Sequence, residues 1–194
     1  METLTTTDAL AAYCAKAAKH PFVTVDTEFL RERTYYAQLC LVQLAVEGDE
    51  AENAVLVDTL ADGLSLDPLY ELMQNPAVTK VFHAGRQDIE IFFVATSAIP
   101  NPVFDTQLAA MVCGFGEQVG YETLVRKLVR GKIDKTSRFT DWSHRPLSDK
   151  QKRYALDDVT HLRDIYKKLD GQYKATGRTA RVDQEMAVHT NPET

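Results

Sequence analysis

Cysteine is scarce in this chain of 194 residues, and the three that occur argue against a cysteine-dependent fold. Cys14, Cys40 and Cys113 are odd in number, far apart and set in apolar sequence. Such spacing implies neither a disulfide framework nor a zinc site, so we interpret them as small core residues. The composition, 44% hydrophobic and 26% charged, is typical of a globular domain that buries a substantial core.

Long hydrophobic runs are also missing. No stretch approaches the roughly 20 apolar residues that a membrane span requires. The first residues, 1–7, lack the basic flank and the apolar run of a signal peptide. The sequence therefore predicts a cytoplasmic protein with no membrane partner.

Positive charge is scarce outside one block. The net charge is −6, which argues against a polyanionic partner, but residues 126–153 hold ten Lys and Arg against three Asp and Glu. A basic block in an acidic chain is typical of a track for nucleic-acid phosphates. It is equally typical of a solvated lysine-rich loop, so the block needs structural context.

The first third of the chain predicts an antiparallel meander. A helix from Thr7 to about His20 precedes an apolar, β-branched strand over 22–29. Two further strand-like runs, 35–46 and 54–58, follow after short polar turns. Three strands connected in this way pair antiparallel.

Helices and short strands then alternate, which is typical of parallel crossovers. The expected elements are a helix over 67–74, a strand over 79–83, a helix over 85–96, a strand over 103–104, and helices over 106–112 and 120–129. A capping box at Ser148 and Gln151 begins a long helix that reaches about Lys174. The sum is an α/β domain with a mixed sheet over residues 1–176. The polar residues 177–194 predict a C-terminal arm or linker.

The strand over 22–29 ends in two carboxylates, Asp26 and Glu28. Side chains alternate along a strand, so both carboxylates point to the same side. A strand of continuous apolar residues is buried, and buried carboxylates need a cation or a proton to compensate them. The pair fits a metal site if other ligands exist; otherwise it fits a strand that ends in two solvated acids.

Two later acids are candidates for the remaining ligands. Asp88 follows the strand over 79–83 and therefore lies at the carboxyl edge of the parallel strands, where ligand-binding residues are found. An acid at this position also stabilises the helix by about 0.3–1 kcal/mol through the helix dipole, so Asp88 fits this role as well. On the long helix, Asp158 lies one turn after Tyr154 on the apolar side that faces the sheet. Asp157 lies on the polar side, so Asp158 is the acid expected to be buried.

Four carboxylates can hold two hard divalent cations, which prefer oxygen ligands. Two such ions are the standard device for attack of water on a phosphodiester. Tyr154 would lie beside that water, and with a pKa near 10 its phenol orients the water rather than deprotonating it at neutral pH.

Four stretches together resemble ribonuclease D, within the 3′-5′ exonucleases that use four acids and a tyrosine. They are VDTEFLRERTYYAQLCLVQLA, KVFHAGRQDIEIFF, FDTQLAA and TDWSHRPLSDKQKRYALDDVTHL, and the similarity covers about residues 5–175. The resemblance implies a ribonuclease H-like fold. It implies five catalytic residues: Asp26, Glu28, Asp88, Tyr154 and Asp158. Arg153 stands where a sister group has histidine, so the tyrosine class is indicated.

The resemblance also implies five substrate contacts: Thr27, Phe29, His83, Trp142 and Arg145. Thr27 and Phe29 would touch the terminal nucleotide, Phe29 by packing on a base or sugar, although an ordinary core position fits Phe29 as well. His83 would line the pocket or be a satisfied buried histidine. Trp142 and Arg145 would stack on a base or contact a phosphate, and a structural role fits the tryptophan too.

The function predicted is a Mg²⁺- or Mn²⁺-dependent 3′-5′ exoribonuclease that releases nucleoside 5′-monophosphates from single-stranded RNA 3′ ends. The family role implies tRNA precursors as substrates, and no obligate protein partner is expected. Two alternatives are a 3′-5′ exodeoxyribonuclease of the proofreading type and an inactive nucleic-acid-binding module that kept the fold. Intact acids at all four positions argue against the inactive module.

Overall fold

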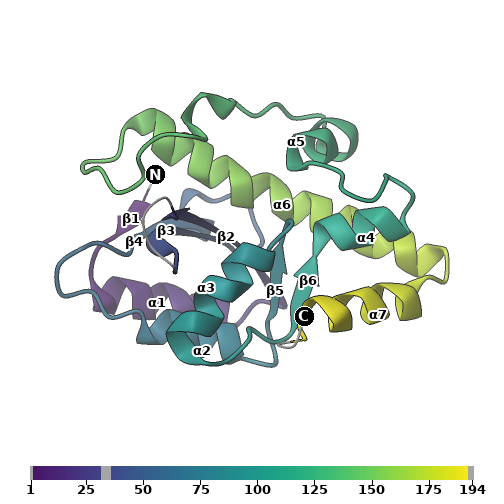
Figure 1. Ribbon diagram of the computed structural model, residues 1–194, viewed down its shortest axis with the longest axis horizontal. Helices are drawn as coiled ribbons and strands as arrows, with labels where there is room; N and C mark the ends of the chain where they lie inside the picture. The colour runs from purple at the N-terminus through teal and green to yellow at the C-terminus, as the bar shows by residue number, and fades with distance from the viewer. Residues whose placement is uncertain (1, 32–35, 192–194) are drawn as a thin grey trace.

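One six-stranded mixed sheet forms the centre of the molecule, with the strand order β1-β4-β3-β2-β5-β6 (Figure 1). The computed structural model describes residues 2–31 and 36–191. The strands are β1 (Glu2–Leu4), β2 (Phe22–Leu30), β3 (Gln38–Ala45), β4 (Ala54–Asp58), β5 (Thr79–Phe82) and β6 (Val103–Asp105). β2, β3 and β4 pair antiparallel, and β5 and β6 continue parallel to β2, so the predicted meander with parallel crossovers is confirmed.

Two details of the sheet differ from the sequence interpretation or lie beyond it. β1 was not predicted; it pairs parallel with β4 at the edge, and three residues are too few to show an alternating pattern. The second strand was predicted to begin at Tyr35, which lies outside the described residues, as does most of the preceding polar turn.

The helices cover both faces of the sheet. They are α1 (Thr7–Ala17), α2 (Asp67–Gln74), α3 (Arg86–Thr96), α4 (Thr106–Val112), α5 (Tyr121–Leu124), α6 (Asp149–Ala175) and α7 (Thr179–His189). α6 crosses one face over β2, β3 and β4, while α1, α2 and α3 lie on the other (Figure 1). The predicted capping box is present, because the side chains of Ser148 and Gln151 each accept from the other's backbone N–H. Among the described residues, no helix has the length and hydropathy needed to cross a bilayer.

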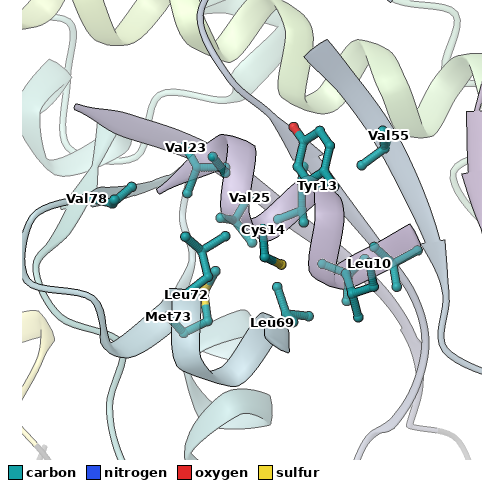
Figure 2. Packing of buried hydrophobic residues seen from close by; sticks show 14 of the residues in the cluster. Leu10, Tyr13, Cys14, Val23, Val25, Val55, Leu69, Leu72, Met73 and Val78 are labelled. Carbon is teal, nitrogen blue, oxygen red and sulfur yellow. The ribbon is translucent and has the colours of Figure 1, made fainter. Parts of the chain in front are cut away.

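Alternation along β2 divides the core into two sides. Val23 and Val25 point toward α1 and α2, where they pack with residues such as Leu10 and Leu69 (Figure 2). The intervening Thr24 points toward α6. By the same alternation, Asp26 and Glu28 lie on the α6 side of the strand.

The C-terminal segment is more ordered than a linker. Residues 179–189 form α7, and its Val182 and Met186 are buried against Phe104 of β6 and the apolar side of α4 and α6. Of the two predicted possibilities, an arm or a linker, the helix fits the arm, because two apolar residues four positions apart dock one face of an otherwise polar segment. The domain boundary at residue 176 stays a prediction.

Candidate active site

The end of β2 and the middle of α6 bring three carboxylates together. The Thr24 hydroxyl donates to the Val159 carbonyl at 2.8 Å and fixes the helix on the strand. Asp158, the residue before Val159, therefore lies over the end of β2. One carboxylate oxygen each from Asp26, Glu28 and Asp158 lies within 4.8 Å of the others. This is the convergence that the strand alternation and the helix face predicted.

Asp88 joins this group from the other side of the strand. It lies in the first turn of α3, is 7% exposed, and accepts a hydrogen bond from the Thr27 hydroxyl of β2. The structure thus places Thr27 as a support for Asp88. Its hydroxyl is engaged with a protein carboxylate, so the contact expected with the terminal nucleotide is left to its backbone.

The turn between β5 and α3 aims Asp88 at the strand. Ala84 has a φ of +53°, a left-handed conformation that is uncommon outside glycine. The Asp105 carboxylate holds the turn by accepting from the backbone N–H of Ala84 at 3.0 Å and of Gly85 at 2.8 Å. A Cβ on Gly85 would lie 2.4 Å from the Cβ of Phe82, so only glycine permits this approach. The positioning role of Asp105 was missed, although its motif FDTQLAA was noted.

Burial raises the pKa of every acid in the group, and repulsion from other acids of the group adds to it for Asp26, Glu28 and Asp158. Burial raises the pKa of Asp26 well above its usual value, and the charges of Asp88, Asp158 and Glu28 add to it. Burial first, then neighbouring acids, raise the pKa of Glu28 to about 9 and that of Asp158 to about 7. Burial also raises the pKa of Asp88 to about 6. A group of this kind binds protons at neutral pH unless cations compensate it.

Tyr154 lies one helical turn before Asp158, as predicted, and its hydroxyl lowers the pKa of the Asp158 carboxyl against the larger effect of burial. Burial, followed by the charges of Asp158, Glu28 and Asp26, raises the pKa of Tyr154 above its usual value. The phenol therefore keeps its proton at neutral pH and acts as a hydrogen-bond donor.

A cavity of about 590 Å³ opens over the acids, and its wall includes Phe29 and His83. The His83 ring nitrogen Nδ1 lies 3.0 Å from the Thr106 hydroxyl, and burial lowers the pKa of His83. His83 is thus both a hydrogen-bonded histidine and part of the wall, and half-buried Phe29 faces the cavity from β2. A β-bulge directly after Glu28 interrupts pairing with β3 at this point.

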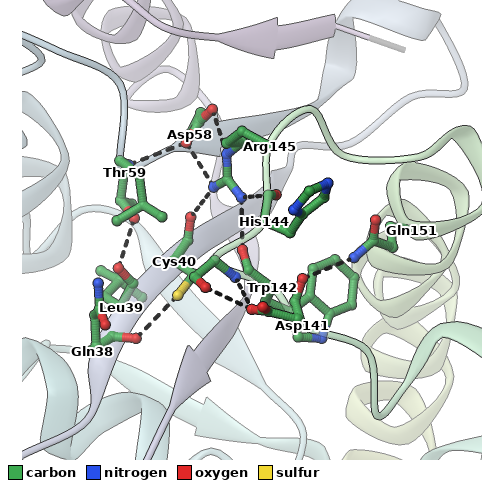
Figure 3. A network of polar contacts seen from close by, with 12 residues as sticks. Gln38, Leu39, Cys40, Asp58, Thr59, Asp141, Trp142, His144, Arg145 and Gln151 are labelled. Carbon is green, nitrogen blue, oxygen red and sulfur yellow. Dashed lines mark hydrogen bonds and ion pairs between the residues drawn. The ribbon is translucent and has the colours of Figure 1, made fainter.

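Two residues expected to contact substrate have structural roles instead. Trp142 is 3% exposed and packs with Leu147 and Ala155 under α6, so it presents no face to a base. The Arg145 guanidinium donates to both carboxylate oxygens of Asp58 and to three backbone carbonyls (Figure 3). Those contacts use all five of its N–H donors, which leaves none for a phosphate. The burial of Trp142 fits the structural role that the sequence also allowed for it, and the contacts of Arg145 favour a structural role that a loop sequence does not show.

Sequence reasoning missed several residues of the cavity wall. Tyr121 donates from its hydroxyl to the Asp157 carbonyl at 2.8 Å and stands 5.4 Å from the His83 ring. Arg138 and Phe139 line the same cavity. Arg138 belonged to the basic block, but nothing in the sequence singled out Tyr121 or Phe139.

The basic block divides between this wall and a second hollow of about 500 Å³. The cations that line the second hollow are Arg126, Arg130 and Lys132, all exposed. Glu122 and Ile133 belong to both walls, so the two hollows adjoin. The helix from α5 continues here as a π-helical turn, Val125–Val129, which carries Arg126.

Comparison with known sequences assigns this chain to a protein family. The family described as 3′-5′ exonuclease matches residues 1–174. The chain belongs to the 3′-5′ exonuclease family. This confirms the family resemblance and the ribonuclease H-like α/β fold that the motifs implied.

Relatives within this family are named Ribonuclease D. The protein from Jannaschia sp. (strain CCS1) is 64% identical over 98% of this chain and 50% of its own length. The one from Nitrobacter hamburgensis is 53% identical over 100% of this chain and 50% of its own length. The crystal structure of Escherichia coli RNase D, described as an exoribonuclease involved in structured RNA processing, is 35% identical with a TM-score of 0.90, covering 97% of this chain and 49% of that one. The chain spans about half the length of the curated relatives it matches.

Proposed function

We propose that this chain is the catalytic unit of a metal-dependent 3′-5′ exoribonuclease that releases nucleoside 5′-monophosphates from RNA 3′ ends. One observation carries the proposal. Oxygens of Asp26, Glu28 and Asp158 lie within 4.8 Å of one another in the wall of an open cavity, in a chain of the 3′-5′ exonuclease family. Asp88 stands in the same wall.

The acids fit divalent cations. Mg²⁺ and Mn²⁺ prefer carboxylate oxygens and keep sites for water and phosphate. The pKa values of Asp26 and Glu28 are raised because the carboxylates are buried close together, and Arg138 offsets this effect on Glu28 only in part. Asp26, Glu28 and Asp158 would hold one ion, and Asp88 would share in a second. Such ions supply a lower pKa for bound water and stabilise charge on the transferred phosphate.

The protein's own groups orient the reactants. The protonated Tyr154 phenol is placed to hold the attacking water beside Asp158. Phe29 and His83, which belong to the same cavity wall, would confine the terminal nucleotide. Water forms a new bond to phosphorus, the bond from phosphorus to the upstream 3′-oxygen breaks, and a nucleoside 5′-monophosphate leaves. We assign Thr27 and Asp105 to positioning, because the Thr27 hydroxyl donates to the Asp88 carboxylate and Asp105 holds the turn that precedes Asp88.

RNA is the substrate class supported best. The relatives are named Ribonuclease D, and the E. coli structure is described as acting in structured RNA processing. We extend this to tRNA precursors in the cytoplasm as the natural substrates. The exposed cations Arg126, Arg130 and Lys132 adjoin the cavity and suit the phosphates of the incoming strand.

A labelled single strand tests the proposal. RNA with a 3′-terminal label should release labelled nucleoside 5′-monophosphate first with Mn²⁺ or Mg²⁺, and none with EDTA. Asp26→Asn and Asp158→Asn should abolish release while far-ultraviolet circular dichroism stays unchanged, and Asp157→Asn is the matched control. Internal fragments as first products, or normal turnover by either acid variant, would overturn the proposal.

The same assay separates the alternatives. A DNA strand of the same sequence that is degraded faster than RNA would indicate the proofreading type of exonuclease. Binding of the labelled strand without metal-dependent release would indicate an inactive binding module. For the phosphate track, Arg126→Ala with Arg130→Ala should lower the slope of log affinity against log salt by about 0.7 for each phosphate that the variant no longer binds.

A further inference from the structure

Phe139 lies at the mouth of the cavity with its ring exposed to solvent, so the ring does not contribute to the packed core. Its side chain is 90% exposed, the highest value among the exposed large apolar residues of the described chain. It nevertheless belongs to the cavity wall that includes the four acids. Its exposure places Phe139 at the rim of the cavity and not on its floor. A strand that leaves the cavity would pass over this rim.

The segment that carries Phe139 is anchored. Ser137, two residues before it, is 5% exposed, and the Thr140 hydroxyl donates to the Ser137 carbonyl at 2.8 Å. The Gln151 side chain donates to the Thr140 hydroxyl at 3.0 Å and ties the segment to the start of α6. The ring is therefore presented from a fixed backbone, which lowers the entropy cost when a ligand packs on it.

Arg138 backs the ring and faces the acids. Its guanidinium carbon lies 5.1 Å from the centroid of the Phe139 ring, within the range of a cation–π contact. The charge of Arg138 also lowers the pKa values of Glu28 and Asp158, against the larger effect of their burial, so it acts on the centre of the site. One short segment thus offers an aromatic face and a cation that reaches toward the acids.

We propose that Phe139, supported by Arg138, is a stacking platform for a base upstream of the scissile phosphate in single-stranded RNA. Aromatic rings bind bases of any sequence in this way, and an adjacent cation suits the phosphate beside that base. The inference rests on the proposed function and adds a subsite to it. It predicts that substrates long enough to reach the rim bind better than dinucleotides.

Steady-state kinetics on RNA strands of two to eight nucleotides tests this platform. Phe139→Ala should raise KM about tenfold for the longer strands and leave kcat and dinucleotide hydrolysis unchanged, while Phe139→Trp should retain the wild-type KM. Phe93→Ala is the matched control, because Phe93 is exposed on α3 and belongs to no described cavity wall.

An abasic nucleotide moved along the strand provides a second readout. At one upstream position it should raise the KM of the wild type to that of Phe139→Ala and have no further effect on the variant. Equal KM values for wild type and Phe139→Ala at every length would overturn the platform while leaving the exonuclease assignment intact. Absence of RNA hydrolysis by the wild type would instead overturn the proposed function.

Discussion

Replacing Asp158 by asparagine should stabilise the metal-free protein. Burial and the neighbouring acids raise the pKa of Asp158 from 3.8 to about 7. With a raised carboxyl pKa, the folded protein binds more protons than the unfolded chain, so this contribution to stability is present below pH 4 and is lost as the pH rises through 7. At 1.36 kcal/mol per pKa unit, the loss at pH 8 is about 4 kcal/mol, an upper bound because nearby carboxyls share the protons.

The free energy of unfolding in EDTA measures this effect. Asp158→Asn should exceed the wild type by up to about 4 kcal/mol at pH 8, and the difference should shrink toward zero near pH 4. Added Mn²⁺ should narrow this difference: a ligand at 100 times its Kd stabilises the wild type by about 2.7 kcal/mol, and the variant, which lacks one carboxylate, should gain less.

Asp157→Asn provides the control for this experiment. Its carboxylate is adjacent in sequence and its charge raises the pKa of Asp158, but it is not among the three that converge and it also interacts with His161 and Arg153. This variant should keep the full stabilisation by Mn²⁺ and normal activity. An Asp158→Asn protein that is less stable than the wild type in EDTA at pH 8 would refute the argument from repulsion and burial.

Three further changes test single residues. Tyr154→Phe should lower kcat about a hundredfold with little change in KM in single-strand hydrolysis, because only the hydroxyl that orients water is removed. Asp105→Ala leaves two backbone N–H groups of the β5–α3 turn without their acceptor and should lower the free energy of unfolding in urea by about 2–4 kcal/mol. Arg145→Ala should cost about 3 kcal/mol in the same measurement. It should leave KM and its salt dependence unchanged, since Asp58 and three backbone carbonyls accept from all five N–H donors of Arg145.

The sequence predicted those parts of the site that depend on local periodicity. Alternation along a strand put Asp26 and Glu28 on one side, and the helical repeat put Asp158 on the face that meets the sheet. Both periodicities belong to the backbone and hold wherever the element lies in the fold. The antiparallel meander followed from the short polar turns between the strands, and the start of α6 followed from its capping box, which are local signals as well.

Side chains outside regular elements did not follow from the sequence. Trp142 and Arg145 lie in an irregular segment, where no repeat indicates orientation, and only packing showed that one is core and the other binds Asp58. The cavity wall beyond the acids joins residues from segments far apart in the chain, including Tyr121 and Phe139. Their proximity is a property of the packed molecule.

By itself the sequence determined the family, the mixed sheet and which acids share a face, because these depend on residue types at fixed spacings. The tertiary structure alone decided how close those acids lie and how strongly burial and repulsion raise their pKa values. It also decided that α7 docks on the domain and that Phe139 stands exposed at the rim. The distance between two residues and the burial of each depend on every element that packs around them, so a local sequence pattern does not predict either quantity.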